Sequence, residues 1–249
     1  MLFDAHVHLG WFDEPAAVAR EAGKRGLGLL AVTVTPDEYR ALRAPLSGEK
    51  NVALAAGLHP WWVRDASEAD ELVAALPQTR WVGEVGLDAS PRHAATYGAQ
   101  LAAFERVCAA CAETSDPSAP VVISVHAVRA ATDALDVLER TGAAERCRCV
   151  LHWFSGSSEE LARARALGCW FSFGERALAT RRGREYARQV PAGRLLLETD
   201  LPAAPGETGG VEVLLASLGR AVDGIAAARG EDAGEVETLL ARNAEELLS

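Results

Sequence analysis

Short apolar runs alternate with amphipathic segments from one end of the chain to the other. Most of the apolar runs lack a strict two-residue alternation, as expected for strands that are buried on both faces. They cover residues 2–7, 27–34, 52–58, 80–86, 120–125, 147–152, 169–173 and 194–198. Helical periodicity follows each of them, over 15–25, 36–43, 67–76, 94–114, 129–141, 158–167, 183–189 and about 211–229. One further helix is predicted over 232–248.

Eight strand–helix units in 249 residues predict an α/β protein with a (β/α)₈ TIM-type barrel and an extra C-terminal helix. We expect a single domain over residues 1–249, because no linker, repeat or low-complexity tract interrupts the pattern. A doubly wound sheet is the second possibility. The chain has no Gly-x-Gly-x-x-Gly after its first strand, which argues against that fold in its dinucleotide-binding form.

Composition narrows the function classes. Hydrophobic residues make up 49% of the chain, which is enough for a full core. Because the net charge is −10, the surface as a whole should not attract nucleic acid or anionic membranes. A local basic patch remains compatible with this charge. No apolar run approaches the roughly 20 residues that a membrane span needs. We expect no signal peptide, because the candidate functional residues begin at Asp4.

The five cysteines predict a reducing compartment, and we expect a cytoplasmic protein. An odd number in a long chain argues against a disulfide framework. Cys108 and Cys111 have zinc-like spacing, but no second pair of that spacing exists, so core thiols are the simpler interpretation.

Histidines and carboxylates gather at the predicted strand ends. His6 and His8 lie two apart on the first strand and therefore face the same side. The other members of the set are His59 after the third strand, Glu84 in the fourth, His126 after the fifth, His152 at the end of the sixth and Asp200 after the eighth. In a barrel these ends form the rim that carries the active site.

This set exceeds what one zinc ion needs, since a catalytic zinc uses about three protein ligands. Two divalent ions that share a bridging carboxylate fit better, and such ions lower the pKa of a bound water. The ligand types do not distinguish Zn, Mn, Mg, Ni or Fe. Taken singly, each histidine could be an ordinary hydrogen-bonded polar residue, and each carboxylate a helix cap or ion-pair partner.

The chain carries an ordered set of motifs: Asp4-Ala-His-Val-His-Leu, Gly57-Leu-His-Pro, Gly83-Glu-Val-Gly-Leu-Asp88, the His126 strand, His152-Trp-Phe-Ser-Gly156, Glu198-Thr-Asp-Leu-Pro202 and Arg242-Asn-Ala-Glu-Glu-Leu. In this order they resemble the motifs of the TatD-related metal-dependent hydrolases of the amidohydrolase superfamily. The resemblance implies two divalent metal ions, one bound by His6 and His8 and the other by His126 and His152. It implies that Glu84 bridges them, and that Asp200 binds the first ion and accepts a proton from the attacking water.

Substrate contacts are predicted in the loops after the strands. His59 either touches substrate phosphate or holds the rim, and Arg129 lies one place later than the arginine of many family members. Arg181 and Arg182 belong to an arginine-rich segment over 175–188, which is either a phosphate-binding patch or a solvated helix face. Trp153, with Trp11, Trp61 and Trp62, either stacks on unpaired bases or packs loops at the barrel mouth.

The leading hypothesis is a TatD-like deoxyribonuclease of the 3′–5′ exonuclease type, acting on DNA or RNA ends or single strands through a metal-bridged hydroxide. A two-metal hydrolase of a small amide, lactone or phosphoester is the first alternative. A metal-stabilised component of a nucleic-acid defence or repair complex is the second. No membrane partner is expected, and the oligomeric state is open, with a monomer slightly favoured.

Overall fold

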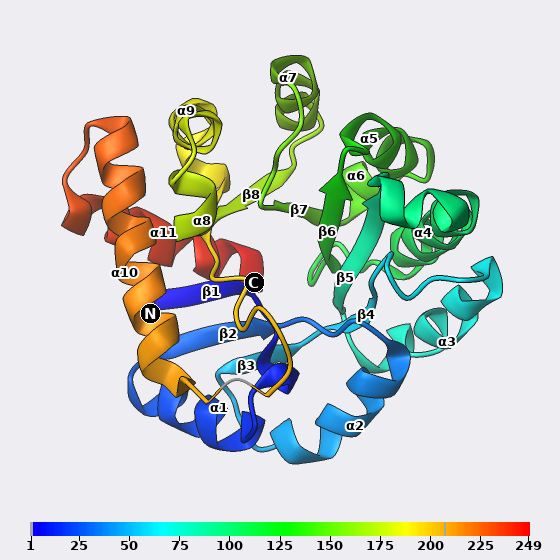
Figure 1. Ribbon diagram of the computed structural model, residues 1–249, viewed down its shortest axis with the longest axis horizontal. Coiled ribbons are helices and arrows are strands. Elements are labelled where there is room, and N and C mark those ends of the chain that lie inside the picture. Colours follow the sequence, from blue (N-terminus) through cyan, green and yellow to red (C-terminus); the bar gives the residue numbers. More distant parts are fainter. Residues whose placement is uncertain (1, 207) are drawn as a thin grey trace. The chain divides into compact units, whose positions relative to one another are not determined.

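The computed structural model describes residues 2–206 and 208–249. Parallel strands and helices alternate along the chain (Figure 1). The chain divides into two compact units. Unit 1 consists of the chain up to Val32, Arg40–Leu54 and the chain from Phe171 onward. Unit 2 consists of Thr33–Tyr39 and Ala55–Trp170. We describe each unit by itself, and the single domain over residues 1–249 stays a prediction.

Unit 1 is built on parallel strands with helices against them. Strands β1 (Leu2–Val7), β2 (Leu27–Ala31) and β3 (Val52–Leu54) form one sheet in that order. In β8 (Trp170–Phe173), the residues from Phe171 to Phe173 pair with β9 (Leu195–Leu197), which lies against β1. The helices are α1 (Pro15–Lys24), α8 (Glu175–Leu178), α9 (Arg181–Gln189), α10 (Gly210–Arg229) and α11 (Ala233–Leu248). Helix α2 (Pro36–Leu46) contains residues of both units.

The predicted C-terminal helix is α11, and it covers the strands that carry part of the candidate site. The Asp232 side chain accepts hydrogen bonds from the first backbone N–H groups of α11, which fixes where the helix begins. Helix α11 packs on β1 and β9, and α10 packs on α8 and α9 (Figure 1). Asn243 of α11 donates to the backbone oxygens of Ala192 and Leu195, which ties the helix to the start of β9.

Unit 2 contains four parallel strands in sequential order: β4 (Ala56–Leu58), β5 (Trp81–Asp88), β6 (Val122–Val128) and β7 (Arg148–His152). Its helices are α3 (Ala69–Val73), α4 (Tyr97–Thr114), α5 (Ala131–Arg140), α6 (Ala143–Arg146) and α7 (Ser158–Ala166). Helix α4 packs on β5, and α6 packs on β7. In neither unit do the strand pairings of the described residues close into a ring.

Several predicted boundaries differ from the structure. The run 52–58 is two strands, because the Thr33 hydroxyl donates to the Ala55 carbonyl and accepts from the Gly57 N–H in place of continuous strand pairing. Only glycine fits at position 57, where a Cβ atom would lie 1.6 Å from the Thr33 carbonyl oxygen. Strands β5 and β6 run two and three residues further than predicted, which places Asp88 and His126 inside strands. The short helices α6 and α8 were not predicted.

None of the helices in the described part of the chain combines the length and the apolar character that a bilayer crossing requires.

The five cysteines are free and buried. Burial raises the pKa of Cys147 to about 11 and that of Cys169 to about 12, and it raises the pKa of Cys108 and Cys149 well above the ordinary value. Since the thiolate is the reactive form, we expect Ellman's reagent at pH 8 to react slowly with the native protein and rapidly with five thiols after denaturation. A thiol that reacts rapidly in the native protein would contradict this expectation.

Candidate metal centre

In unit 2, three buried imidazoles surround one oxygen of a buried carboxylate. Glu84 Oε1 lies 2.6 Å from His126 Nδ1, 2.9 Å from His152 Nε2 and 3.3 Å from His59 Nε2. Glu84, His126 and His152 lie in β5, β6 and β7, and His59 directly follows β4. These parallel strands are neighbours in the sheet, so their carboxyl ends lie at one edge. Sequence reasoning predicted that these four residues would meet, and the structure brings them together.

The donor set of this cluster suits a divalent cation. Imidazole nitrogen and carboxylate oxygen are the ligands that zinc and related metals take in proteins. Nδ1 of His126 and Nε2 of His152 face each other at 3.4 Å, close to the separation of about 3.4 Å between two ligands of one tetrahedral ion. His59, Glu84 and His126 offer ligand atoms that all lie within 4.8 Å of one another.

His59 differs from its two neighbours in the tautomer that its contacts require. Its Nδ1 accepts the backbone N–H of Trp61 at 3.1 Å. A neutral imidazole that accepts at Nδ1 carries its proton on Nε2, and that nitrogen faces Glu84. A protonated nitrogen has no lone pair for a metal, so this arrangement suits a hydrogen-bond donor to Glu84 better than a metal ligand.

Asp88 is a site residue that sequence reasoning did not assign. This buried carboxylate lies at the end of β5, with Oδ2 3.6 Å from Nε2 of His126. It also accepts from Trp61 Nε1 at 2.5 Å and from the Ser90 N–H at 2.7 Å. Burial alone would raise the pKa of Asp88, but the contacts with His126, Ser90 and Trp61 outweigh burial and lower it. The carboxylate is therefore held charged beside the imidazole.

The carboxylates of Asp88 and Glu84 also change the pKa of His126. Burial lowers the pKa of this imidazole, and the carboxylates of Asp88 and Glu84 raise it by more, so the net direction is upward. Asp88 faces the ring nitrogen that points away from the Glu84 cluster. A carboxylate at the second nitrogen of a metal-binding histidine fixes the ring and increases its basicity.

We therefore expect Asp88→Asn to raise the metal concentration needed for half-maximal activity by about 10- to 100-fold. Activity at saturating metal should stay closer to that of the wild type, because Asp88 acts through His126. Metal titration of the hydrolytic rate measures this effect. The surface variant Asp223→Asn, which removes an exposed charge from α10, should leave the titration unchanged. An unaltered titration in Asp88→Asn would contradict the assigned role.

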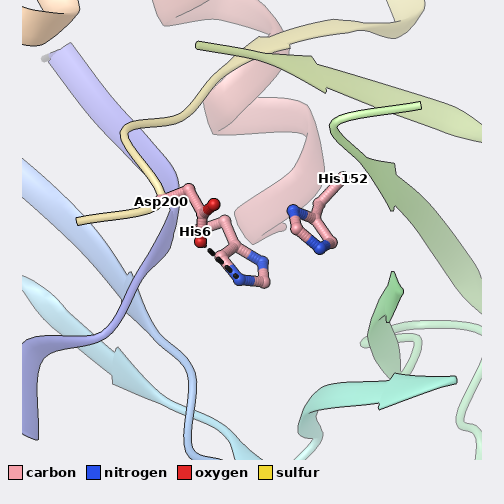
Figure 2. Close-up of side chains that lie close together, drawn as sticks. All are labelled: His6, His152 and Asp200. Atoms are coloured by element: carbon pink, nitrogen blue, oxygen red, sulfur yellow. Dashed lines mark ion pairs between the residues drawn. The ribbon is translucent and has the colours of Figure 1, made fainter. Parts of the chain in front are cut away.

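In unit 1, two further imidazoles face Asp200. Nε2 of His8 lies 3.4 Å from Asp200 Oδ1, and Nε2 of His6 lies 3.8 Å from it; Figure 2 shows the His6–Asp200 pair. Both distances are longer than a typical hydrogen bond, but they are near the distance between two ligand atoms of one metal ion. The Trp11 ring stacks on His8 at 4.3 Å, which supports the imidazole from one side.

A hydrogen-bond network from Asp4 fixes the positions of these ligands. The buried Asp4 carboxylate accepts from the Thr199 N–H at 2.9 Å and the Thr199 hydroxyl at 2.6 Å, and from the His6 N–H at 3.2 Å. Burial raises the pKa of Asp4 to about 7, against the lowering effect of these donors. The Asp200 N–H donates to the His6 carbonyl, so β1 and the segment after β9 are joined on both sides of the ligands.

Backbone conformation marks the same loops. In the described part of the chain, the non-glycine residues with positive φ are Arg129 (54°), Trp153 (39°) and Asp200 (53°). This conformation costs about 1–3 kcal/mol for a non-glycine residue and clusters at functional sites. Asp200 is a predicted ligand, Trp153 follows His152 directly, and Arg129 follows β6. Sequence patterns give no signal for this strain.

The other residues predicted to contact substrate lie at or near the protein surface. Arg129, Arg181 and Arg182 are exposed, and Trp153 is half-buried. In the arginine-rich segment, Arg188 pairs with Glu185 within α9, and Arg184 donates to the carbonyls of Leu178 and Ala179. Arg184 and Arg188 therefore have structural partners within the protein.

Comparisons with known proteins agree with the geometry. The model of the family described as "TatD related DNase" matches residues 3–249. The "3'-5' ssDNA/RNA exonuclease TatD" of Klebsiella pneumoniae (strain 342) is 35% identical over 197 residues, which cover 76% of this chain and 72% of the relative. The "Uncharacterized metal-dependent hydrolase YcfH" of Escherichia coli (strain K12) is 30% identical over 216 residues, covering 81% and 77%.

The crystal structure of YJJV, a TatD homologue from Escherichia coli K12, superposes with a TM-score of 0.75 at 22% sequence identity and covers 99% of this chain and 97% of that one. This likeness confirms the predicted fold class. The family match and the named relatives confirm the predicted resemblance and the class of metal-dependent hydrolases. The chain therefore belongs to the TatD related DNase family.

Proposed function

We propose that this protein is a two-metal phosphodiesterase that hydrolyses single-stranded DNA, and RNA, from the strand end. The observation that carries the proposal is the convergence of buried imidazoles on Glu84 in unit 2, matched by the two imidazoles that face Asp200 in unit 1. Relatives named as 3′–5′ single-strand exonucleases support the choice of substrate and the direction of cleavage.

The assignment of ligands follows the family resemblance residue by residue. His126 and His152 would hold one divalent ion, His6, His8 and Asp200 the other, and Glu84 would serve both. When bound, the ions would supply Lewis acidity to the phosphodiester and lower the pKa of water. His59 would hold the Glu84 carboxylate through its Nε2–H.

Asp200 would accept the proton of the attacking water. Its side chain is 19% exposed, so solvent reaches a carboxylate whose position the backbone fixes. A carboxylate that is both placed and reachable suits general-base catalysis.

The test uses purified protein freed of metal with a chelator and then supplied with Mn²⁺, Mg²⁺ or Zn²⁺. We expect stepwise release of nucleotides from a 5′-labelled single strand, no release without metal, and loss of release in His6→Ala. Activity should fall as salt concentration rises, because a polyanionic substrate releases counterions when it binds. Equal behaviour of wild type and His6→Ala, with no nucleotide release, would contradict the proposal.

A small amide, lactone or phosphoester is the alternative substrate class, and the net charge of −10 favours it. The same preparation should be offered lactones and p-nitrophenyl phosphodiesters. Metal-dependent turnover of these compounds without nucleotide release would support the alternative.

A further inference from the structure

Two neighbouring tryptophans of unit 2 are exposed beside the Glu84 cluster. Trp61 is 45% exposed and Trp62 is 38% exposed, and in the described part of the chain the other large hydrophobic side chain of this kind is Val213. Single exposed apolar residues are ordinary on protein surfaces. Two adjacent indoles are less so, because together they place a large aromatic area in contact with water.

The two indoles belong to an ordered aromatic group. The Trp61 and Trp62 rings stack at 6.2 Å with 21° between their planes, and His93 stacks on Trp61 at 5.2 Å and 13°. The Arg92 guanidinium lies 5.7 Å from the centre of the Trp61 ring. His93 is half-buried in this stack. We call Trp61, Trp62, Arg92 and His93 the aromatic platform.

The aromatic platform is held in place from the side of the candidate metal ligands. Trp61 donates through Nε1 to Asp88 and through its backbone N–H to His59 Nδ1. The His59 ring contacts Trp61 and Trp62 edge to face at 5.0 and 5.3 Å, and the Trp61 and His126 rings lie 6.4 Å apart. The aromatic platform therefore contacts His59 directly and lies close to His126, two of the imidazoles around Glu84.

We propose that the aromatic platform is a subsite that stacks an unpaired nucleobase of the substrate strand, with Arg92 beside it for the phosphate. This inference rests on the proposed nuclease function. Base stacking on an aromatic side chain tolerates any sequence, because every base has a π-face. Arg92 supplies a local positive charge on an acidic protein, and its planar guanidinium suits phosphate oxygens.

The platform also selects the form of the nucleic acid. Bases inside a duplex are already stacked on their neighbours, so only an unpaired base can offer its face to Trp61 or Trp62. Because the indoles are already ordered by Asp88 and His59, binding would cost little additional side-chain ordering. The subsite therefore favours single strands and frayed ends.

Trp62 is the better position for a test, because Trp61 also holds Asp88. We expect Trp62→Ala to raise KM for a single-stranded oligonucleotide by about 5- to 150-fold, the range for loss of one base–aromatic stack. The value of kcat should change much less, and Trp62→Phe should recover most of the affinity. Val213→Ala, which removes exposed apolar surface in unit 1, is the matched control, and circular dichroism confirms folding of each variant.

A second series replaces one nucleotide at a time, counted from the 3′ end, by an abasic residue. In the wild type, KM should rise at one abasic position, and in Trp62→Ala the same abasic strand should add little further, since both changes remove one interaction. Independent effects of the abasic residue and the Trp62→Ala substitution would overturn the subsite. A KM for Trp62→Ala equal to that of Val213→Ala would also overturn it, and this is the result expected if the tryptophans bind a protein partner instead. Failure of the wild type to cleave any strand is a separate result, which overturns the proposed function itself.

Discussion

Asp200→Asn is expected to lower kcat by about 10²- to 10⁴-fold, the usual loss when a positioned general base is removed. Asparagine has nearly the same shape and keeps an oxygen toward His6 and His8, but it cannot accept a proton. The backbone at Asp200 adopts a positive φ, and asparagine tolerates that conformation well. The variant should therefore fold and retain much of its metal while losing the proton acceptor.

The measurement pairs single-turnover rates on a labelled single strand with metal content per chain. Asp223→Asn, an exposed aspartate of α10, is the control for removal of one negative charge. A kcat within tenfold of wild type at full metal content would assign the proton acceptor to another residue. Complete loss of metal would instead mean that Asp200 acts mainly as a ligand.

The fold was largely predictable because parallel strands buried on both faces leave a strong signal in sequence. The eight apolar runs correspond to strands, and the helix over 232–248 corresponds to α11. The predicted strand boundaries were wrong where a side-chain hydrogen bond replaced pairing between backbone groups. Thr33 divides the third run by bonding to Ala55 and Gly57, and no local pattern around 52–58 shows that a distant hydroxyl will do so.

The candidate ligands were predictable for a related reason, since parallel topology brings the ends of sequential strands together. Within unit 2, Glu84, His126 and His152 meet as predicted, and within unit 1, His6, His8 and Asp200 do so. Their roles as ligands stay a prediction. Topology says which residues meet but not which nitrogen of an imidazole faces inward, and that detail separates His59 from the other histidines.

Asp88 and the aromatic platform were harder to assign from sequence. Asp88 lies in a recognised motif, but its contact with His126 depends on β5 and β6 running beyond their apolar cores. The tryptophans were predicted either to pack loops or to stack on bases. Trp11 packs on His8, whereas Trp61 and Trp62 remain exposed, so similar loop positions in the sequence led to different surroundings.

Glu84→Gln is expected to remove the largest share of metal affinity, more than the 10- to 100-fold expected for a residue that acts through a ligand. Glu84 is buried, and one of its oxygens contacts three imidazoles. Glutamine has the same size but no charge, and half of its polar end is an NH₂ donor. It cannot balance the charge of a divalent ion in a buried site, where a charge needs a charged partner.

Thermal denaturation with and without metal measures this loss independently of activity. Metal at 100 times its Kd should stabilise the wild type by about 2.7 kcal/mol, which corresponds to roughly 5–10 °C for a protein of this size. Glu84→Gln should show little of that shift, while Glu113→Gln, an exposed glutamate of α4, should show all of it. A full metal-induced shift in Glu84→Gln would show that the imidazoles bind the ions without this carboxylate.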